Sequence, residues 1–126
     1  MMKRLMIVDD EAGITRIVGL VATQLGLDFK ALNSSVTARD VFVAYRPDVL
    51  IIDVSMPEKD GIAVLEEVLA TGIPARIVLT SGFGDACSRR ANEVTQRRSV
   101  EPARFLRKPF RRTELEALLG ELASGS

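Results

Sequence analysis

Residues 49–53 read VLIID, a run of four apolar residues that ends in an acid. Continuous apolar runs of this length predict strands that are buried on both faces. Similar runs occupy residues 5–8 and 77–79, and weaker strand patterns occupy residues 27–32 and 104–106. Because strands covered on both sides lie in parallel sheets with crossover helices, this set indicates an α/β protein.

Amphipathic stretches separate these strands. Apolar residues recur at helical spacing within residues 14–25, 36–45, 62–69 and 115–122. Residues 33–35 read NSS and offer a turn and a helix N-cap. Right-handed crossovers and short loops then favour a doubly wound, five-stranded parallel sheet in the order 2-1-3-4-5, a flavodoxin-like architecture with about five helices.

The helix expected between residues 82 and 102 has only a thin apolar stripe. Its members are Phe83, Cys87, Ala91 and Val94. Because so little apolar area would hold this helix against the sheet, we expect it to be irregular or mobile.

The composition excludes several classes of chemistry. The chain has 126 residues, 17 of them basic and 17 acidic, so its zero net charge provides no overall attraction to nucleic acid or to an anionic membrane. It contains no histidine and one cysteine, which removes imidazole catalysis, thiolate clusters and disulfides. The side chains that remain favour a hard cation bound by oxygen.

The length fits one domain, which we expect over residues 1–123 with a tail over 124–126. No stretch has the length of a signal-peptide core or of a membrane helix. With a single cysteine and no such segment, we expect a reducing, cytoplasmic setting.

Polar residues gather where the predicted strands end. They are Asp9 and Asp10 after the first strand, Asp53 after the third, Thr80 and Ser81 after the fourth, and Lys108 after the fifth. In an open parallel sheet these ends line one cleft, beside the point where the strand order reverses. Taken singly, each residue has a simpler interpretation, as a helix cap for the acids and hydroxyls or a surface residue for the lysine. Taken together, they predict one site.

The chemistry of such a site is constrained by charge. Three crowded carboxylates repel one another unless one of them takes a proton or they share a cation. With oxygen ligands only, Mg²⁺ is the best candidate. Lys108 would add a positive charge and Thr80 a neutral donor, which together suit a phosphoryl group in transfer. The residues therefore indicate phosphorylation of an aspartate, with Asp53 as the central acid.

Four motifs at successive strand ends resemble the response-regulator receiver domain of bacterial two-component signalling, of the chemotaxis-regulator-like kind. They are VDDE at residues 8–11, IIDVSMPEKDG at 51–61, LTSG at 79–82 and KPF at 108–110. The resemblance extends over essentially the whole chain. One departure is that the segment between Thr80 and Lys108 is longer than is usual in the family, and we place the excess in residues 95–102.

The resemblance implies a role for each site residue. Asp53 would be the phosphoacceptor and, with Asp10, a side-chain ligand of Mg²⁺. Ser55 would bind the ion through its backbone carbonyl and Asp9 through a bound water. Lys108 would contact Asp53 or its phosphate.

The resemblance also implies a switch. Thr80 would move to hydrogen-bond the phosphoryl oxygen, and Phe105 would turn inward as it does so. Ordinary packing of an aromatic side chain is the competing interpretation of Phe105. The family further implies a cis peptide bond between Lys108 and Pro109. The surface that responds would surround the fourth helix, the fifth strand and the fifth helix.

The function expected from these residues is a phosphoacceptor switch and not an enzyme with an external substrate. A histidine kinase or phosphotransfer protein would donate the phosphoryl group, and the downstream partner would be a protein, with a homodimer possible and no nucleic acid or membrane involved. A receiver-like interaction module that works without phosphorylation is the alternative. A phosphatase or flavin-binding protein of the same topology fits less well, because Ser55 stands where the phosphatase needs a second acid and the acids at residues 9–11 would repel a flavin phosphate.

Overall fold

A single parallel sheet in the order β2-β1-β3-β4-β5 forms the centre of the protein, as predicted. The computed structural model describes residues 3–82 and 85–124. The strands in that part of the chain are β1 (Arg4–Val8), β2 (Asp28–Leu32), β3 (Val49–Asp53), β4 (Arg76–Ser81) and β5 (Arg104–Arg107). The helices are α1 (Ala12–Gln24), α2 (Ala38–Tyr45), α3 (Gly61–Ala70), α4 (Asp85–Arg97) and α5 (Arg112–Ser124).

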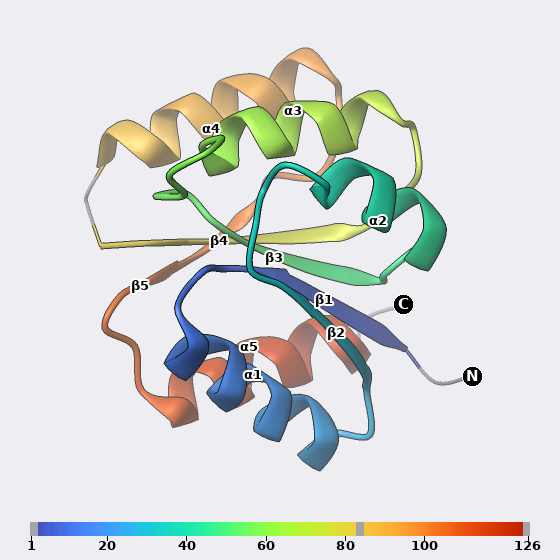
Figure 1. The fold of residues 1–126 in the computed structure, drawn as a ribbon. Coiled ribbons are helices and arrows are strands. Elements are labelled where there is room, and N and C mark those ends of the chain that lie inside the picture. Colours follow the sequence, from blue (N-terminus) through green and yellow to red (C-terminus); the bar gives the residue numbers. More distant parts are fainter. Residues whose placement is uncertain (1–2, 83–84, 125–126) are drawn as a thin grey trace.

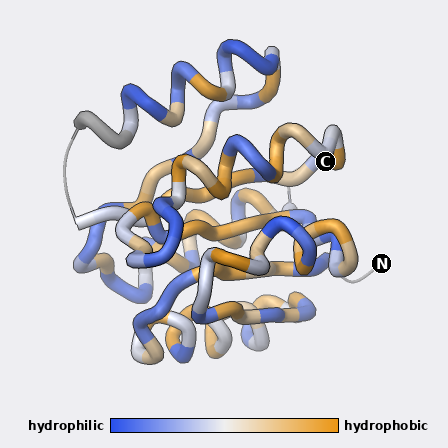
Figure 2. The backbone as a smooth tube through the Cα atoms, turned by 45° about the horizontal axis from the view of Figure 1, so that its top comes forward, coloured by the Kyte–Doolittle hydropathy of each residue, from blue (hydrophilic) through white to orange (hydrophobic). Residues whose placement is uncertain are grey.

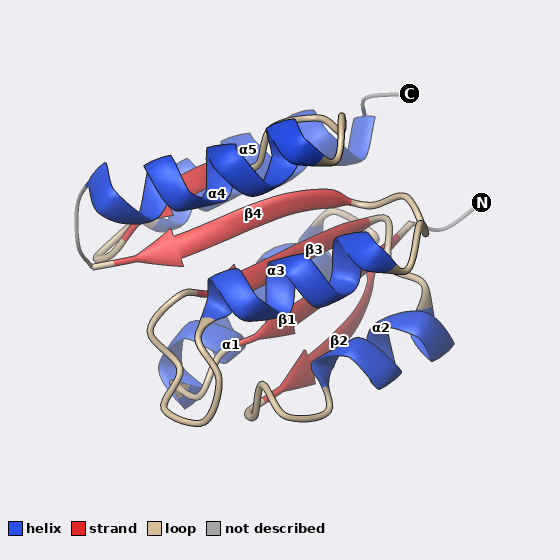
Figure 3. Cartoon of the chain, turned by 90° about the horizontal axis from the view of Figure 1, so that it is seen from above, coloured by secondary structure: helices blue, strands red, loops and turns tan. Residues whose placement is uncertain are grey.

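The helices cover both faces of the sheet. Helices α2, α3 and α4 lie on one face, and α1 and α5 lie on the other (Figure 1). Seen from above, the strands run between these two layers and all point the same way (Figure 3). The alternation of strand and helix along the sequence therefore gives the three-layer arrangement that buried parallel strands require.

The central strands divide their side chains between two cores. Leu50 and Ile52 pack in the core under α2, α3 and α4, and Val49 and Ile51 pack in the core under α1 and α5. This follows from the period of two along a strand. The strands at the centre are accordingly the most apolar part of the chain (Figure 2). Each fully buried side chain of this size contributes about 1.5–3 kcal/mol to folding, so the sheet is a rigid base for the residues at its ends.

Three helices begin or end as their flanking residues dictate. Asp60 caps α3 through its side chain, which accepts a hydrogen bond from the backbone N–H of Ala63. Arg46 ends α2 in a left-handed conformation with φ of 53°, directly before Pro47, which disfavours a helical residue in front of it. Gly26, with φ of 73°, follows the end of α1 as expected.

The predicted N-cap of α2 within residues 33–35 is wrong. The helix begins later, and its N-cap residue is Thr37, which makes no side-chain capping bond. Ser34 instead accepts a hydrogen bond from the N–H of Val36, which closes a local turn. Ser35 is buried, and its hydroxyl makes no hydrogen bond among the described residues. Local turn formation competed with capping for the Ser34 hydroxyl.

The ends of two strands also differ from the prediction. Asp53 is the last residue of β3, and Thr80 and Ser81 belong to β4 instead of following it. Asp53 pairs with Thr80, and Thr80 pairs with Leu106 across the sheet. These residues have polar side chains, but their backbones continue the ladder of hydrogen bonds, so the strands extend through them.

The fourth helix was expected to be irregular or mobile; the first of these is wrong, because α4 is a continuous α-helix of 13 residues, and the second stays a prediction. Ala91, Val94 and Thr95 are buried and hold it against the sheet and α3. Phe83 and the side chain of Cys87, which belong to the predicted apolar stripe, lie outside the described residues. A short stripe of buried residues is therefore enough to hold a regular helix when a neighbouring helix packs beside it.

The C-terminal helix α5 continues through Ser124, the first residue of the predicted tail. Among the helices of the described residues, none combines the length and the apolar character that crossing a bilayer requires.

Candidate functional site

Three carboxylates meet at the carboxyl ends of β1 and β3, as predicted. Asp9 and Asp10 directly follow β1, and Asp53 ends β3. One oxygen atom from each of the three side chains lies within 4.8 Å of the other two. Asp9 and Asp53 are buried, with 1% and 2% of their surface exposed, and Asp10 is exposed. The cluster therefore has two buried acids at its base and one at its open side.

Lys108 reaches the same cluster from the end of β5. Its Nζ lies 3.1 Å from Asp9 Oδ2 and 3.3 Å from Asp53 Oδ2. The backbone holds the residue in place, because Lys108 N donates to the carbonyl of Ser81 at 2.9 Å. The Lys108–Pro109 peptide bond is cis, as the family resemblance implied. The chain thus brings together four residues that are as far apart as 9 and 108 in the sequence.

Glu11 is a further member of this site, to which the sequence analysis gave no role. Its Oε1 accepts a hydrogen bond from Lys108 Nζ at 2.9 Å, the shortest of the three ion-pair distances that the ammonium makes. The only signal in the sequence was the position of Glu11 directly after Asp9 and Asp10. That position is equally typical of an acid that stabilises a helix N-terminus.

Backbone groups fix the two buried carboxylates. Asp9 Oδ1 accepts the N–H of Glu11 at 2.8 Å, and Asp53 Oδ1 accepts the N–H of Ser55 at 3.0 Å. In each case the acceptor lies two residues before the donor, the geometry of an Asx turn. One oxygen of each carboxylate is therefore held, and the other faces Lys108.

Charge and burial act against each other in this cluster. Burial raises the pKa of the Asp9 carboxyl above its usual range, although the hydrogen bonds from Glu11 and Lys108 oppose the shift. Burial alone would lower the pKa of Lys108, but its hydrogen bonds to Glu11 and Asp9 and the charges of Asp9 and Asp53 outweigh burial and raise it. Lys108 is therefore charged at neutral pH, and the acids around it outnumber it.

The residues fit a hard divalent cation. Asp9, Asp10 and Asp53 supply only oxygen, and three carboxylate oxygens already converge without a second cation to offset their charge. A cavity of about 450 Å³ adjoins Asp9 and Asp10 on the side of α1 and β2, and Thr15 and Asn33 help to line it. The cluster is therefore open to solvent on the side of Asp10.

Thr80 and Phe105 occupy adjacent strands beside the cluster. Thr80 is 1% exposed, and its Oγ1 has no hydrogen-bond partner among the described residues. Phe105 lies in the edge strand β5, paired with Leu79, and is 40% exposed. Its exposure does not suit the competing interpretation of Phe105 as a core residue. Thr80 instead offers a buried donor beside Asp53 that the resting structure leaves unused.

We expect Thr80→Val to stabilise the resting protein. An unsatisfied buried hydroxyl costs about 1–3 kcal/mol, and valine has nearly the same shape without it. The free energy of unfolding, measured with urea, should rise by about 1 kcal/mol. A decrease of that size would show that the hydroxyl has a stabilising partner in solution.

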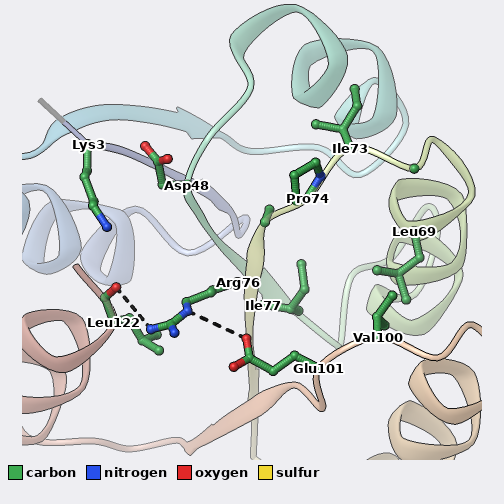
Figure 4. Close-up of a pocket in the computed structure, with 12 residues that line it drawn as sticks. Lys3, Asp48, Leu69, Ile73, Pro74, Arg76, Ile77, Val100, Glu101 and Leu122 are labelled. Atoms are coloured by element: carbon green, nitrogen blue, oxygen red, sulfur yellow. Dashed lines mark hydrogen bonds and ion pairs between the residues drawn. The ribbon is translucent and has the colours of Figure 1, made fainter. Parts of the chain in front are cut away.

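A second hollow lies at the opposite end of the strands (Figure 4). It has a volume of about 530 Å³, and Asp48, Arg76 and Val100 are among its lining residues. The Arg76 guanidinium makes two long contacts there, 3.7 Å to Glu101 and 3.4 Å to the carbonyl of Leu122. Among the residues that the structure describes, the three metal-binding side chains that gather are those of the acid site at the carboxyl ends, which is therefore the candidate functional site.

The fold and the acid cluster together define a class of protein, a doubly wound domain with a carboxylate pocket at its switch point. The profile of the response regulator receiver domain family matches residues 5–120. The chain therefore belongs to the response regulator receiver domain family of two-component systems.

Individual relatives agree with this assignment. The chain is 31% identical to the chemotaxis protein CheY of Bacillus subtilis over 85 residues, which cover 67% of this chain and 71% of CheY. It is 30% identical to the regulatory protein AtoC of Escherichia coli over 82 residues, which cover 65% of this chain and 18% of AtoC. The chain thus spans less than half the length of several curated relatives that it matches, including 45% of the probable transcriptional regulator ycf27 of Porphyra purpurea.

Solved structures show the same fold. The chemotaxis response regulator CheY4 of Vibrio cholerae superposes with a TM-score of 0.84 at 21% identity, covering 97% of this chain and 99% of that one. The BeF3-activated DrrB receiver domain superposes with a TM-score of 0.75 at 20% identity, covering 99% of this chain and 100% of that one.

Proposed function

We propose that this receiver domain accepts a phosphoryl group on Asp53 in a reaction that depends on Mg²⁺. The observation that carries the proposal is the position of Lys108 Nζ, 3.3 Å from Asp53 and 3.1 Å from Asp9, with Asp10 completing the carboxylate cluster. A carboxylate beside both a cation site and an ammonium is suited to attack a phosphorus atom.

Each residue of the site has a part in this reaction. Asp10 and Asp53 would hold the ion with their side chains, Ser55 with its backbone carbonyl and Asp9 through a bound water. When bound, Mg²⁺ neutralises negative charge on the phosphoryl oxygens. An Asp53 oxygen attacks the phosphorus atom of a phosphohistidine on the donor protein. The bond between phosphorus and the histidine nitrogen breaks, and its electron pair stays on that nitrogen. Lys108 stabilises the charge on the transferred group.

Thr80 supports the second half of the proposal, a change of surface after phosphorylation. Its buried hydroxyl has no hydrogen-bond partner within residues 3–82 and 85–124 and lies in the strand position paired with Asp53. A phosphoryl oxygen on Asp53 would provide that partner. The movement of Thr80 would then allow the exposed ring of Phe105 to turn inward and alter the surface formed by α4, β5 and α5.

We propose a histidine kinase or phosphotransfer protein as the donor and a protein as the downstream partner, in the cytoplasm. The domain would act as a switch, because the only reaction it assists is the gain and loss of its own phosphoryl group. A homodimer is one form that the downstream interaction can take.

Labelling by a small acyl phosphate tests this function. With Mg²⁺ present, the wild-type protein should take up one phosphoryl group, and Asp53→Asn should abolish the uptake because the amide is not a nucleophile. Asp40→Asn is the matched control, since Asp40 is an exposed aspartate on α2 that is not part of the cluster. Intact-protein mass spectrometry measures the added mass.

Two results would contradict the proposal. Full labelling of Asp53→Asn would show that another residue is the acceptor. A Mg²⁺ titration without binding in the millimolar range would favour the alternative, an interaction module that works without phosphorylation.

A further inference from the structure

Lys108 Nζ donates a hydrogen bond to Glu11 and lies within ion-pair distance of Asp9 and Asp53 before any phosphoryl group arrives. Its ammonium has three N–H donors, and three carboxylates surround it. The distances from Nζ are 2.9 Å to Glu11, 3.1 Å to Asp9 and 3.3 Å to Asp53. A phosphoryl oxygen that accepts a hydrogen bond from Lys108 therefore competes with Glu11, which accepts one at the shortest of the three distances.

Glu11 is the partner that is easiest to release. The side chains of Asp9 and Asp53 are 0% and 3% exposed, and each is also held by a backbone N–H. The side chain of Glu11 is 58% exposed, and it makes no capping bond to α1 although Glu11 is the N-cap residue. Water can therefore solvate the Glu11 carboxylate as soon as it leaves Lys108, whereas the two aspartates would stay buried without their cation.

We propose that Glu11 is a positioning residue that holds Lys108 in the resting site and is displaced by the phosphoryl group. This inference rests on the proposed function of Asp53. Because Glu11 and the phosphoryl oxygens compete for one ammonium, the contact lowers the affinity of the site for phosphate and its mimics. Glu11 thereby sets how readily this receiver reaches its phosphorylated state.

Glu11 is not a ligand of the cation in this proposal. The oxygen atoms that converge within 4.8 Å belong to Asp9, Asp10 and Asp53, and the Glu11 carboxylate is directed to the ammonium instead. Neutralising Glu11 should therefore change the binding of a phosphoryl mimic and leave the affinity for Mg²⁺ unchanged. A residue that acts only on the stability of the fold would not separate these two measurements.

The experiment compares three variants with the wild-type protein. Glu11→Gln removes the charge, and Glu11→Asp keeps the charge but shortens the reach to Lys108 by one methylene. Glu58→Gln is the matched control, because Glu58 is an exposed acid in the loop between β3 and α3 at the same end of the sheet and has no contact with Lys108. The two glutamine variants have the same net charge, and Glu11→Asp keeps the charge at position 11, so the three variants together separate loss of the contact from loss of charge.

The probe is beryllium fluoride with Mg²⁺, followed by ¹⁹F NMR because the chain contains no tryptophan. Both Glu11 variants should bind beryllium fluoride with an affinity about two- to fivefold higher than that of the wild-type protein. This is the range expected for the loss of a partly exposed ion pair. Labelling by a small acyl phosphate should become faster by a similar factor. Glu58→Gln should match the wild-type protein in both measurements, and all variants should bind Mg²⁺ alike.

Three outcomes would overturn the proposal. Equal behaviour of Glu11→Gln and Glu58→Gln would mean that Glu11 contributes only its long-range charge. Weaker fluoride binding by Glu11→Gln would mean that the contact assists Lys108 instead of competing for it. A tenfold loss of Mg²⁺ affinity would make Glu11 a metal ligand. Asp53→Asn is measured in parallel, so full labelling of that variant would reject the proposed function itself and not the role of Glu11.

Discussion

Lys108→Ala should lower the free energy of unfolding by about 3 kcal/mol at pH 7, because removing one partner of a buried ion pair leaves the other charges uncompensated. The Lys108 side chain is only 14% exposed, and its loss would leave Asp9 and Asp53 facing each other in a buried site. Urea unfolding monitored by circular dichroism measures the change. Mg²⁺ should restore part of the lost stability, because it binds only the folded cluster.

The matched control is Lys59→Ala. Lys59 makes a shorter ion pair than Lys108 does, 2.8 Å to Glu67, but the two side chains are 30% and 37% exposed. Ion pairs with access to water contribute about 0–1 kcal/mol, so this variant should lose much less stability. Equal losses for the two lysines would show that burial does not govern the energetics of the site.

The difference in unfolding free energy between the wild-type protein and Lys108→Ala should become smaller as the pH falls. Burial already raises the pKa of Asp9 in the wild-type protein, and loss of the lysine raises it further. A carboxyl whose pKa is raised by folding contributes stability at low pH and loses it as the pH rises through the folded-state pKa. Unfolding curves between pH 7 and about pH 5 should therefore converge toward the wild-type curve at the acidic end.

Gly61→Ala should also destabilise the protein strongly. A Cβ atom at this position would lie 2.6 Å from the carbonyl oxygen of Asp53 and 2.7 Å from Cα of Val54. Both neighbours are backbone atoms, and Gly61 N donates to Val54 O at 3.0 Å, so the contact cannot be relieved by a side-chain rotation. We expect a loss of about 2–3 kcal/mol in unfolding free energy and weaker Mg²⁺ binding, because the backbone of Asp53 must shift.

Gly120→Ala is the control for this prediction. Gly120 is also within a helix, but no atom outside its immediate neighbourhood lies within 4 Å of an added Cβ. Alanine should stabilise α5 there by up to about 1 kcal/mol. If both substitutions had the same sign and size, close approach to the Asp53 backbone would not be the reason for glycine at position 61.

Much of the site could be predicted from the sequence because apolar runs locate strand ends to within one or two residues. The apolar run at residues 49–52 ends at Asp53, and parallel strands place their carboxyl ends along one edge of the sheet. Asp9, Asp10, Asp53 and Lys108 were therefore predicted to meet, and they do. Errors arose where local signals competed, as at residues 33–35, or where a polar side chain lay within a strand, as at Thr80.

The sequence by itself determined where the strands lie and which residues end them, since these follow from local hydrophobic patterns, and it determined the oxygen ligands of the pocket through the absence of histidine. The order of the strands followed from the general rules for right-handed crossovers and short connections. Only the tertiary structure decided that Glu11 shares Lys108 with the two buried aspartates, that the Thr80 hydroxyl is buried without a partner in the described part of the chain, and that Gly61 approaches the backbone of Asp53 closely. Such contacts join residues that are distant along the chain, and their distances depend on how helices and loops pack, which no local pattern contains.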